Sequence, residues 1–420
     1  MSKEKRLVPE LRFPEFDGEW EETTVDEVFD YLKTNSLSRS QLSNIGNIRN
    51  IHYGDIHTKF QILLDPNEEE IPYVNNELSS INVGSLLKNG DLILADASED
   101  SIGVGKSIEL INVHDSVVSG LHTIAIRPKI ELFYRGYIGY YFNSYHNHRR
   151  LVKMSVGSKV KSISKATLSK TSIFYPIIKE QQKIATFLSL IDKKIELLEK
   201  KIELLEEQKR GLLQKIFSQE LRFKKDDGSE FEEWEIKKLI DCLDVCKSGG
   251  TPRSTNRSYY NGEYPFLSIS DMTKQGKYLS KTEKSVTQKG IDNSSTWLVQ
   301  PNHIIYSMYA SVGEVSINHI SLCTSQAMLS MLPNKNVNLE YLYYYLKKIK
   351  EETSKFIGFG AQGNVSAQIV KNYDIFIPEL EEQKKIANFL SKHDWLIDNA
   401  KRSLDNISKL KKGLLQKMFI

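Results

Sequence analysis

A segment with the residue types of a phosphate-binding loop lies at Gly103-Val-Gly-Lys-Ser107. In the complete pattern, backbone amides cradle phosphates and a lysine reaches their outer oxygens, but a further glycine must stand five positions before the Gly-Lys pair. Asp100 occupies that position here. We therefore expect a turn between two strands. An enzyme that binds a nucleotide through this loop remains an open alternative.

Residues of the types that bind metal ions occur in two other places. Cys242 and Cys246 are close in sequence, but His303 and His319 are too far away and wrongly spaced to complete a zinc finger. We expect both cysteines to be buried in a core helix. The segment His146-Asn-His148 is basic and has no spaced carboxylates beside it, so we expect no nuclease site there. The sequence therefore predicts no metal and no cofactor.

Signatures of DNA-modifying and DNA-cleaving enzymes are also missing from the sequence. It contains no Asn/Asp-Pro-Pro-aromatic tetrad for methylation of an amino group and no Gly-rich loop for a methyl donor. It has no Pro-Asp pair followed by Glu-x-Lys on strands, because Glu199-Lys-Lys201 lies in a helical segment. These absences favour a binding protein without catalytic residues.

The element that must position any binding residues is a long helix predicted over Glu180–Phe217. Its apolar residues alternate spacings of four and three, which predicts a narrow coiled-coil seam. Pro176–Phe217 aligns without a gap to Pro378–Phe419 at a constant offset of 202, so the partner helix is in the same chain. The predicted seam comprises Ile184, Leu188, Ile191, Ile195, Leu198, Ile202, Leu205, Ile386, Leu390, Ile397, Ala400, Leu404 and Ile407.

The duplication extends beyond the helices. Leu11-Arg-Phe13 with Trp20 recurs as Leu221-Arg-Phe223 with Trp234. Between these landmarks and the helices lie two bodies of dissimilar sequence, in which Ile304–Tyr309 predicts a strand and Leu132–Phe142 a helix. We predict an α+β protein with two mixed α/β bodies and a pseudo-twofold repeat. Its expected divisions are 1–175 (N-terminal segment and first body), 176–220 (first long helix), 221–377 (second body) and 378–420 (second long helix).

Composition limits the class of protein. A chain of 420 residues with 40% apolar and 26% charged residues is typical of a globular protein of two or three domains. Three cysteines indicate a reducing compartment rather than a disulfide framework, and no apolar run approaches the roughly 20 residues of a membrane span. Met1–Arg6 leads into no apolar run, so we expect no signal peptide and a cytoplasmic location.

The net charge is only +3, so the distribution of charge must indicate the partner. His146–Pro176 contains seven Lys or Arg residues and no acid, and Lys247–Lys289 contains eight against three acids, with tyrosines between them. Such stretches fit contacts with phosphates and base edges, although a solvated loop explains any single residue equally well. The candidate DNA-binding residues are Arg49, His52, Tyr53, Lys59, Lys106, Lys159, Lys161, Lys165, Arg253, Arg257, Tyr259, Tyr260, Lys274, Tyr309, Gln326, Gln362 and Asn364.

Several of these motifs resemble the DNA specificity subunit of type I restriction-modification systems. The resemblance rests on the LRFPEFDGEWEE segment, the two Pro-x-x-x-Glu-Gln-x-x-Ile-Ala-x-Phe-Leu segments and the two GLLQK helix ends. Ser248-Gly-Gly-Thr-Pro252 with Tyr259-Tyr-Asn-Gly262 is similar to the opening of one of its readers. The turn Ala310–Gly313 and the segment Thr324–Gln326 fit as well.

The resemblance implies two target-recognition domains that alternate with two long helices paired antiparallel. Each domain would bind one half of a bipartite, asymmetric target in double-stranded DNA. Two modification subunits, which methylate adenine, and motor-nuclease restriction subunits would be the protein partners, and no membrane would be involved. The family implies no catalytic residue in this subunit. The alternative from a different class is a non-enzymatic coiled-coil adaptor whose two bodies bind proteins.

The repeat also predicts how the chain closes. Leu221–Phe223 follows the end of the first helix directly, whereas its counterpart Leu11–Phe13 has no helix before it in the sequence. Symmetry therefore predicts that Leu11–Phe13 lies near Phe419, at the end of the second helix. We expect burial of Leu11, Phe13 and Phe16 to stabilise this contact.

Overall fold

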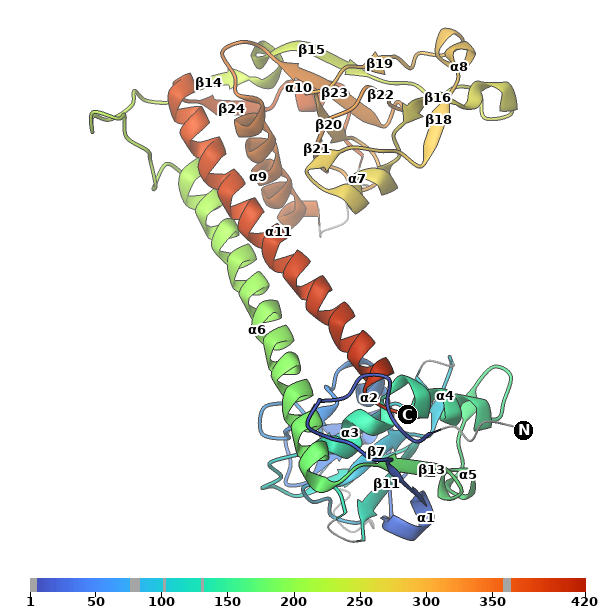
Figure 1. Cartoon of the computed structure of the whole chain (residues 1–420). Coiled ribbons are helices and arrows are strands. Elements are labelled where there is room, and N and C mark those ends of the chain that lie inside the picture. Colours follow the sequence, from blue (N-terminus) through green and yellow to red (C-terminus); the bar gives the residue numbers. More distant parts are fainter. Residues whose placement is uncertain (1–5, 76–83, 101–102, 130–131, 358–363) are drawn as a thin grey trace. The chain divides into compact units, whose positions relative to one another are not determined.

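The sequence repeat reappears as two compact units in the computed structural model (Figure 1). Unit 1 consists of Met1–Lys200 and Lys401–Ile420, and unit 2 of Lys201–Ala400. The structure describes residues 6–75, 84–100, 103–129, 132–357 and 364–420. Two long helices, α6 (Ile178–Phe217) and α11 (Leu380–Lys417), contribute a part to each unit.

The first body, in unit 1, is built from short strands and helices. Its helices are α1 (Val25–Val28), η1 (Arg39–Gln41), α2 (Tyr53–Thr58), α3 (Tyr137–Phe142), α4 (Tyr145–Met154) and α5 (Lys165–Ser169). Its strands are β1 (Glu21–Thr24), β2 (Phe29–Tyr31), β3 (Leu42–Ser43), β4 (Arg49–Ile51), β5 (Leu63–Leu64), β6 (Tyr73–Val74), β7 (Leu92–Ala95), β8 (Ala97–Ser98), β9 (Ser107–Leu110), β10 (Val117–Ser119), β11 (Thr123–Pro128), β12 (Lys161–Ser162) and β13 (Ser172–Tyr175). The main sheets have the orders β2-β11-β7-β9-β5 and β10-β4-β6-β3.

The second body, in unit 2, also has a five-stranded and a four-stranded sheet. Its helices are η3 (Leu239–Cys242), η4 (Arg257–Tyr259), α7 (Ile269–Gln275), α8 (Gln288–Asp292), α9 (Leu339–Ile357) and α10 (Ala367–Lys371). Its strands are β14 (Glu235–Lys238), β15 (Leu243–Ser248), β16 (Tyr260–Phe266), β17 (Tyr278–Leu279), β18 (Lys284–Val286), β19 (Leu298–Val299), β20 (Ile304–Ser307), β21 (Val315–Asn318), β22 (Leu322–Cys323), β23 (Met328–Pro333) and β24 (Asp374–Ile377). The main sheets have the orders β15-β23-β20-β21-β17 and β18-β16-β22-β19.

The five-stranded sheets of the two bodies share strand directions as well as strand order, and the four-stranded sheets share three strands, β10-β4-β6 and β22-β16-β18. The β5–β9 and β17–β21 pairs are parallel, as are β4–β10 and β16–β22, while the central pairs of both five-stranded sheets are antiparallel. Ala95 pairs with Thr123 where Ser307 pairs with Met328, so these positions correspond. The predicted α+β class with two mixed α/β bodies is confirmed.

Within each unit the two long helices run antiparallel. In unit 1, Asp192 of α6 forms an ion pair with Lys411 of α11 at 2.5 Å, and in unit 2 Lys209 forms one with Asp394. The offset of 202 converts the first pair into the second. Residues late in α6 therefore meet residues early in α11, as the family resemblance implies.

The predicted seam residues are divided between fully and partly buried positions. The buried ones are Ile184, Leu188, Ile191, Leu198, Ile386, Leu390, Ile397 and Ala400. The half-buried ones are Ile195, Ile202, Leu205, Leu404 and Ile407. The stripe thus lies on the covered side of both helices.

The Glu-Gln pair that starts each helix anchors the segments around it. Glu180 accepts two hydrogen bonds from Arg12, at 2.8 and 2.7 Å, and Glu382 accepts the matching pair from Arg222, at 3.3 and 2.9 Å. Gln181 donates to Pro176 O at 2.8 Å. Because both carboxylates are buried, these bonds hold the LRF segment on the first turn of the helix.

The predicted closure of the chain is confirmed within unit 1, where the N-terminal segment runs beside the end of α11 (Figure 1). Leu11 N donates to Lys417 O at 2.8 Å, as Leu221 N donates to Lys215 O at 3.0 Å in unit 2. The expected burial is wrong for Leu11, which is 43% exposed, because its backbone makes the contact. Phe13 is half-buried and packs edge-on against Phe187.

Several expected elements differ in the structure. The helix expected over Leu132–Phe142 begins at Tyr137, because Gly136 precedes it with a φ of 87° that ends the loop. β20 ends at Ser307 rather than at Tyr309, because the chain turns there through residues in the left-handed conformation. The two cysteines do not share a core helix: Cys242 ends η3 and Cys246 lies in β15. Among the helices of the described residues, none has the length and apolar character that a membrane crossing requires.

Candidate nucleic-acid interface

Three loops leave the five-stranded sheet of the second body at one edge. Ser248 at the end of β15 pairs with Leu329, and Ser307 at the end of β20 pairs with Met328. The loops after β15, after β20 and before β23 therefore emerge side by side. We call them the loop edge of the second body.

Close packing fixes two of these loops on each other. A Cβ atom at Gly249 would lie 1.9 Å from Thr324 O, and Gly250 N donates to the same oxygen at 3.0 Å. Thr251 Oγ1 donates to Gln326 Oε1 at 2.7 Å. The paired glycines of the Ser-Gly-Gly-Thr-Pro segment are thus required by contact between backbones, and they bring Thr251 beside the exposed Gln326.

The third loop holds two consecutive residues in the left-handed region. Ala310 has a φ of 43° and Ser311 a φ of 54°. The buried hydroxyl of Ser307 donates to Tyr309 O at 2.8 Å and to Ala310 O at 3.0 Å, which stabilises the turn. Such strain persists only where the surroundings enforce it. The turn presents the exposed ring of Tyr309 at the loop edge.

The other candidates of the second body lie in different surroundings. Arg253 and Arg257 are exposed, and Tyr259 and Tyr260 are half-buried. Lys274 is exposed but forms an ion pair with Glu283. The exposed Asn364 precedes Val365, whose amide donates to Met308 O at 3.0 Å, and so lies beside the loop edge, while Gln362 lies outside the described residues.

The first body has a corresponding loop edge after β7 and before β11. Asp96 N donates to His122 O at 3.1 Å and joins the two loops. Lys161 in β12 pairs with Ser98 in β8, which brings the acid-free basic run to the same edge. Lys159 and Lys165 are exposed on that run. The structure therefore brings this run and the β7–β9 loop together.

Aromatic and imidazole rings cluster at the loop edge of the first body. The Tyr53 ring lies 4.6 Å from His52, 5.8 Å from His57 and 5.2 Å from His122, between centroids. His52 is buried, which lowers its pKa, and its Nδ1 accepts from Gly54 N at 3.2 Å to cap α2. Sequence reasoning missed His57 and His122. His57 lies four residues after Tyr53 in α2, a helix not predicted from the sequence, and the fold of the sheet brings His122 beside Tyr53.

The apparent phosphate loop is a turn that packs on α2. Residues 103–105 form the turn, and β9 follows. Lys106 Nζ donates to His57 O at 2.8 Å, and burial lowers the pKa of Lys106. A Cβ atom at Gly103 would lie 2.9 Å from His57 Nδ1. The lysine and the first glycine of the motif are thus explained by packing rather than by phosphate.

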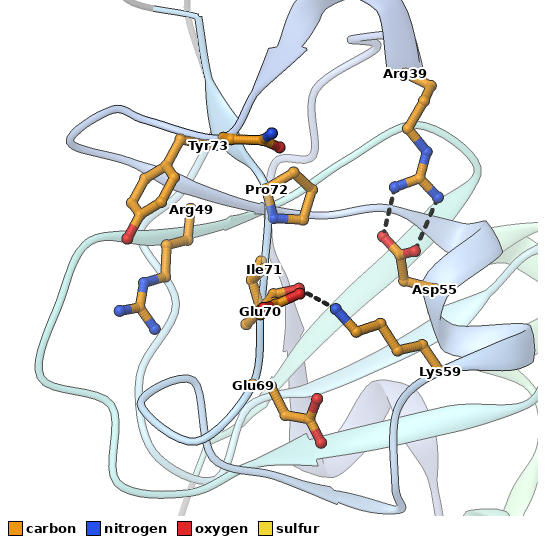
Figure 2. A pocket seen from close by; sticks show the side chains of 10 residues that line it. Arg39, Arg49, Asp55, Lys59, Glu69, Glu70, Ile71, Pro72 and Tyr73 are labelled. Atoms are coloured by element: carbon orange, nitrogen blue, oxygen red, sulfur yellow. Dashed lines mark hydrogen bonds and ion pairs between the residues drawn. The ribbon is translucent and has the colours of Figure 1, made fainter. Parts of the chain in front are cut away.

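Two more candidates line a pocket of about 600 Å³ in the first body (Figure 2). Its walls are Arg39, Asn44, Arg49, Asp55, Lys59, Glu69, Glu70, Ile71, Pro72 and Tyr73. Figure 2 shows Arg39 facing Asp55, with bonds of 2.9 and 2.8 Å, and Lys59 reaching Glu70 O. Arg49 Nη2 lies 3.1 Å from Asp115. Since the three cations of the pocket balance its three carboxylates, it does not form a basic surface.

The described residues contain no group of His, Cys, Asp and Glu that could hold a metal ion. Cations that lie at or near the loop edges without a carboxylate partner among the described contacts include Lys159, Lys161, Lys165, Arg253 and Arg257. Both bodies thus combine preorganised loops with nearby positive charge, which is the pattern of a surface that contacts phosphates and base edges.

Comparison with known proteins defines the class. The model of the type I restriction modification DNA specificity domain matches residues 17–207 and 231–409, and the chain belongs to this family. The MjaIX specificity subunit of Methanocaldococcus jannaschii is 31% identical over 208 residues, which cover 49% of this chain and 48% of that subunit. The chain thus spans about half the length of that relative.

Longer matches extend the similarity. The putative MjaX specificity subunit of the same organism is 26% identical over 341 residues, covering 78% of this chain and 76% of that one. A solved type I restriction-modification S subunit from M. genitalium has a TM-score of 0.58 at 15% identity, covering 98% and 99% of the two chains. This structural likeness concerns the fold alone.

Proposed function

We propose that this chain is the non-catalytic, sequence-specific subunit of a type I restriction-modification complex and binds double-stranded DNA in the cytoplasm. Each body binds one half of a bipartite target. Two modification subunits and the motor-nuclease subunits assemble on this chain, which positions them on the DNA. The functional divisions are 1–175, 176–220, 221–377 and 378–420. The observation that carries the proposal is the match of both repeats to one DNA-specificity family.

The loop edges support a division of labour among the candidates. Lys159, Lys161, Arg253 and Arg257 contact phosphates, which position the protein without reading sequence. Base edges are contacted by Tyr309 and Gln326 in the second body, with their neighbours, and these contacts specify the DNA sequence. We leave His52, Lys59 and Lys106 out of this set, because the structure engages each of them inside the first body.

The two half-sites differ, so the target is asymmetric. The five-stranded sheets of the two bodies share strand order and direction, but their loop edges carry different groups. The first presents imidazole rings around Tyr53, and the second presents Tyr309, Thr251 and Gln326. Different donors and acceptors select different base pairs in the major groove.

Methylome sequencing of a host that produces this chain with its modification subunits tests the proposal. We expect methylated adenines in one bipartite motif that disappears when the gene for this chain is deleted. In vitro, duplex binding by the complex should weaken steeply with salt, because phosphate contacts release counterions. A protein-binding adaptor gives no motif and no salt-dependent duplex binding, and either absence rejects the proposal. Nucleotide binding by the isolated chain favours the enzyme alternative.

A further inference from the structure

A rigid turn at the loop edge of the first body presents one strained histidine. Gly120 N donates to Ile51 O at 2.9 Å, and a Cβ atom at Gly120 would lie 2.6 Å from Asn50 Nδ2. His122 follows with a φ of 54°, a left-handed conformation that is uncommon for a residue with a side chain. Half of its side chain is exposed, at 49%. The body holds this backbone in a costly conformation and leaves the imidazole on the surface.

Further bonds make the turn preorganised. The hydroxyls of Ser119 and Thr123, on either side of it, lie 2.7 Å apart, and Thr123 also donates to Gly120 O. Both residues are buried. Because the turn is fixed from both ends, the direction of the His122 Cα–Cβ bond is fixed before any ligand binds.

The surroundings of the imidazole distinguish its two nitrogens. His122 Nδ1 lies 3.5 Å from Asp96 Oδ1, and the ring packs edge-on against Tyr53. These are the titratable groups that face it, and His52 and His57 lie beyond, around Tyr53. A carboxylate beside Nδ1 favours the neutral tautomer with its proton on that atom. Nε2 is then an acceptor, and within the described part of the chain no hydrogen bond engages it.

We infer that His122 is a specificity-determining DNA contact of the first body and that Asp96 is its positioning residue; this inference rests on the proposed function. Neutral His122 offers the Nε2 lone pair to the major groove, where the hydrogen-bond donors are the amino groups of adenine and cytosine. Strand register places Ala327 at the corresponding position of the second body. The contact therefore belongs to one half-site only.

The test uses the full chain assembled with its modification subunits. His122→Asn removes the imidazole and keeps a residue type that tolerates the left-handed region, and His122→Gly is the second variant for the same purpose. The matched control is His114→Asn, an exposed histidine away from the loop edge. Binding is measured for duplexes that carry the methylated motif and for duplexes with single base-pair substitutions in either half.

We expect His122→Asn and His122→Gly to lose roughly 5- to 100-fold discrimination at one base pair of one half-site, the range of a single good base contact. Discrimination in the other half and affinity for random duplex stay unchanged, as does every property of the control. Retention of full discrimination by both variants overturns the inference, and so does an equal loss in both half-sites. A complex that never binds the duplex specifically refutes the proposed function instead.

A double variant separates the contact from a structural role. Asp96→Asn keeps the size of the side chain but removes the carboxylate beside His122 Nδ1. We expect Asp96→Asn to weaken discrimination at the same base pair as His122→Asn, and the double variant to lose no more than His122→Asn alone, because Asp96 acts through His122. Unchanged discrimination in Asp96→Asn, or a full further loss in the double variant, overturns the positioning role.

Discussion

Lys277 Nζ lies 2.7 Å from the hydroxyl of Tyr344 and 4.4 Å from the centroid of its ring. The ammonium also forms ion pairs with Glu340 and with Asp394, the latter at 3.6 Å. Its side chain is only 12% exposed. This cluster fastens the second body to α11 within unit 2. By strand register, the position matching Lys277 in the first body is Ile62.

Replacing Lys277 with alanine should destabilise unit 2. Without the ammonium, less positive charge compensates the partly buried carboxylates of Glu340 and Asp394. We expect the free energy of unfolding to fall by about 2 kcal/mol. Urea unfolding followed by tryptophan fluorescence measures it, since three of the four tryptophans, Trp234, Trp297 and Trp395, lie in unit 2. Lys274→Ala is the matched control, because its ion pair with Glu283 is exposed, and no measurable change is expected. Equal effects of both variants would contradict the assignment.

The stability of unit 1 should depend on pH through Glu109. This carboxyl is buried, which raises its pKa to about 7 from 4.5, although it accepts from Gly136 N and Gly139 N. The folded state keeps the proton that the unfolded state loses, so stability falls as pH rises from about 4.5 through 7. The full effect is on the order of 3 kcal/mol.

Unfolding of Glu109→Gln at several pH values measures this contribution. The difference in the free energy of unfolding between wild type and variant should change between about pH 4.5 and pH 7 and be constant outside that range. A constant difference over the whole range would show that Glu109 stays ionised in the fold.

Alanine substitution of the assigned phosphate contacts should weaken binding without changing specificity. The residues are Lys159, Lys161, Arg253 and Arg257. Each variant should lower the affinity for target and random duplex about equally, and each should reduce the salt slope by roughly 0.9. Lys129→Ala and Lys335→Ala are the controls. Both lysines are exposed and follow β11 and β23, at the ends of these strands that point away from the loop edges. Unchanged affinity in all four variants would remove these loops from the interface.

Exchange of residues 20–175 for another first body should change one half-site and leave the other. The reason is that the conserved pattern of the repeat resides in the helices and the LRF segments, whereas the bodies differ. Methylome sequencing of the hybrid reads both halves at once. A simultaneous change in both halves would show that the bodies do not read independently.

The spacer between the half-sites should depend on helix length. Insertion of one heptad within Ile195–Leu205, together with one at Ile397–Ile407, keeps the seam in register and lengthens each helix by about 10 Å. At roughly 3.4 Å per base pair, the spacer should grow by about three pairs. The methylated motif of the variant gives the result. An unchanged spacer, or altered half-sites, would argue against the helices as the determinant.

The duplicated segments and the long helices with periodic apolar residues were predictable from the sequence. The repeated LRF segments and helix ends predicted that Leu11–Phe13 lies near the end of α11, because symmetry requires no knowledge of side-chain packing. In the structure Leu11 meets Lys417 as Leu221 meets Lys215. Other contacts between residues that are far apart in the sequence were not predictable from it. Nothing near His122 in the sequence indicates that strand register brings it to Asp96.

Glycine and charge patterns were also ambiguous in the sequence. Gly103 and Lys106 have residue types that suit phosphate, and only the fold shows that they pack against His57. The sequence suggests that Lys59 is a free cation, but in the fold its ammonium donates to Glu70 O. Composition identifies which groups are present, but the partner of each group depends on the tertiary structure.

Among the residues that the structure describes, the glutamine at the start of each helix bonds to main-chain atoms alone. Gln181 donates to Leu132 O and accepts from Tyr134 N, and Gln383 does the same with Asn336 O and Asn338 N. A joint of this kind does not depend on which side chains the body carries. Recombination that exchanges a whole body would therefore leave this joint intact without a compensating mutation of the glutamine.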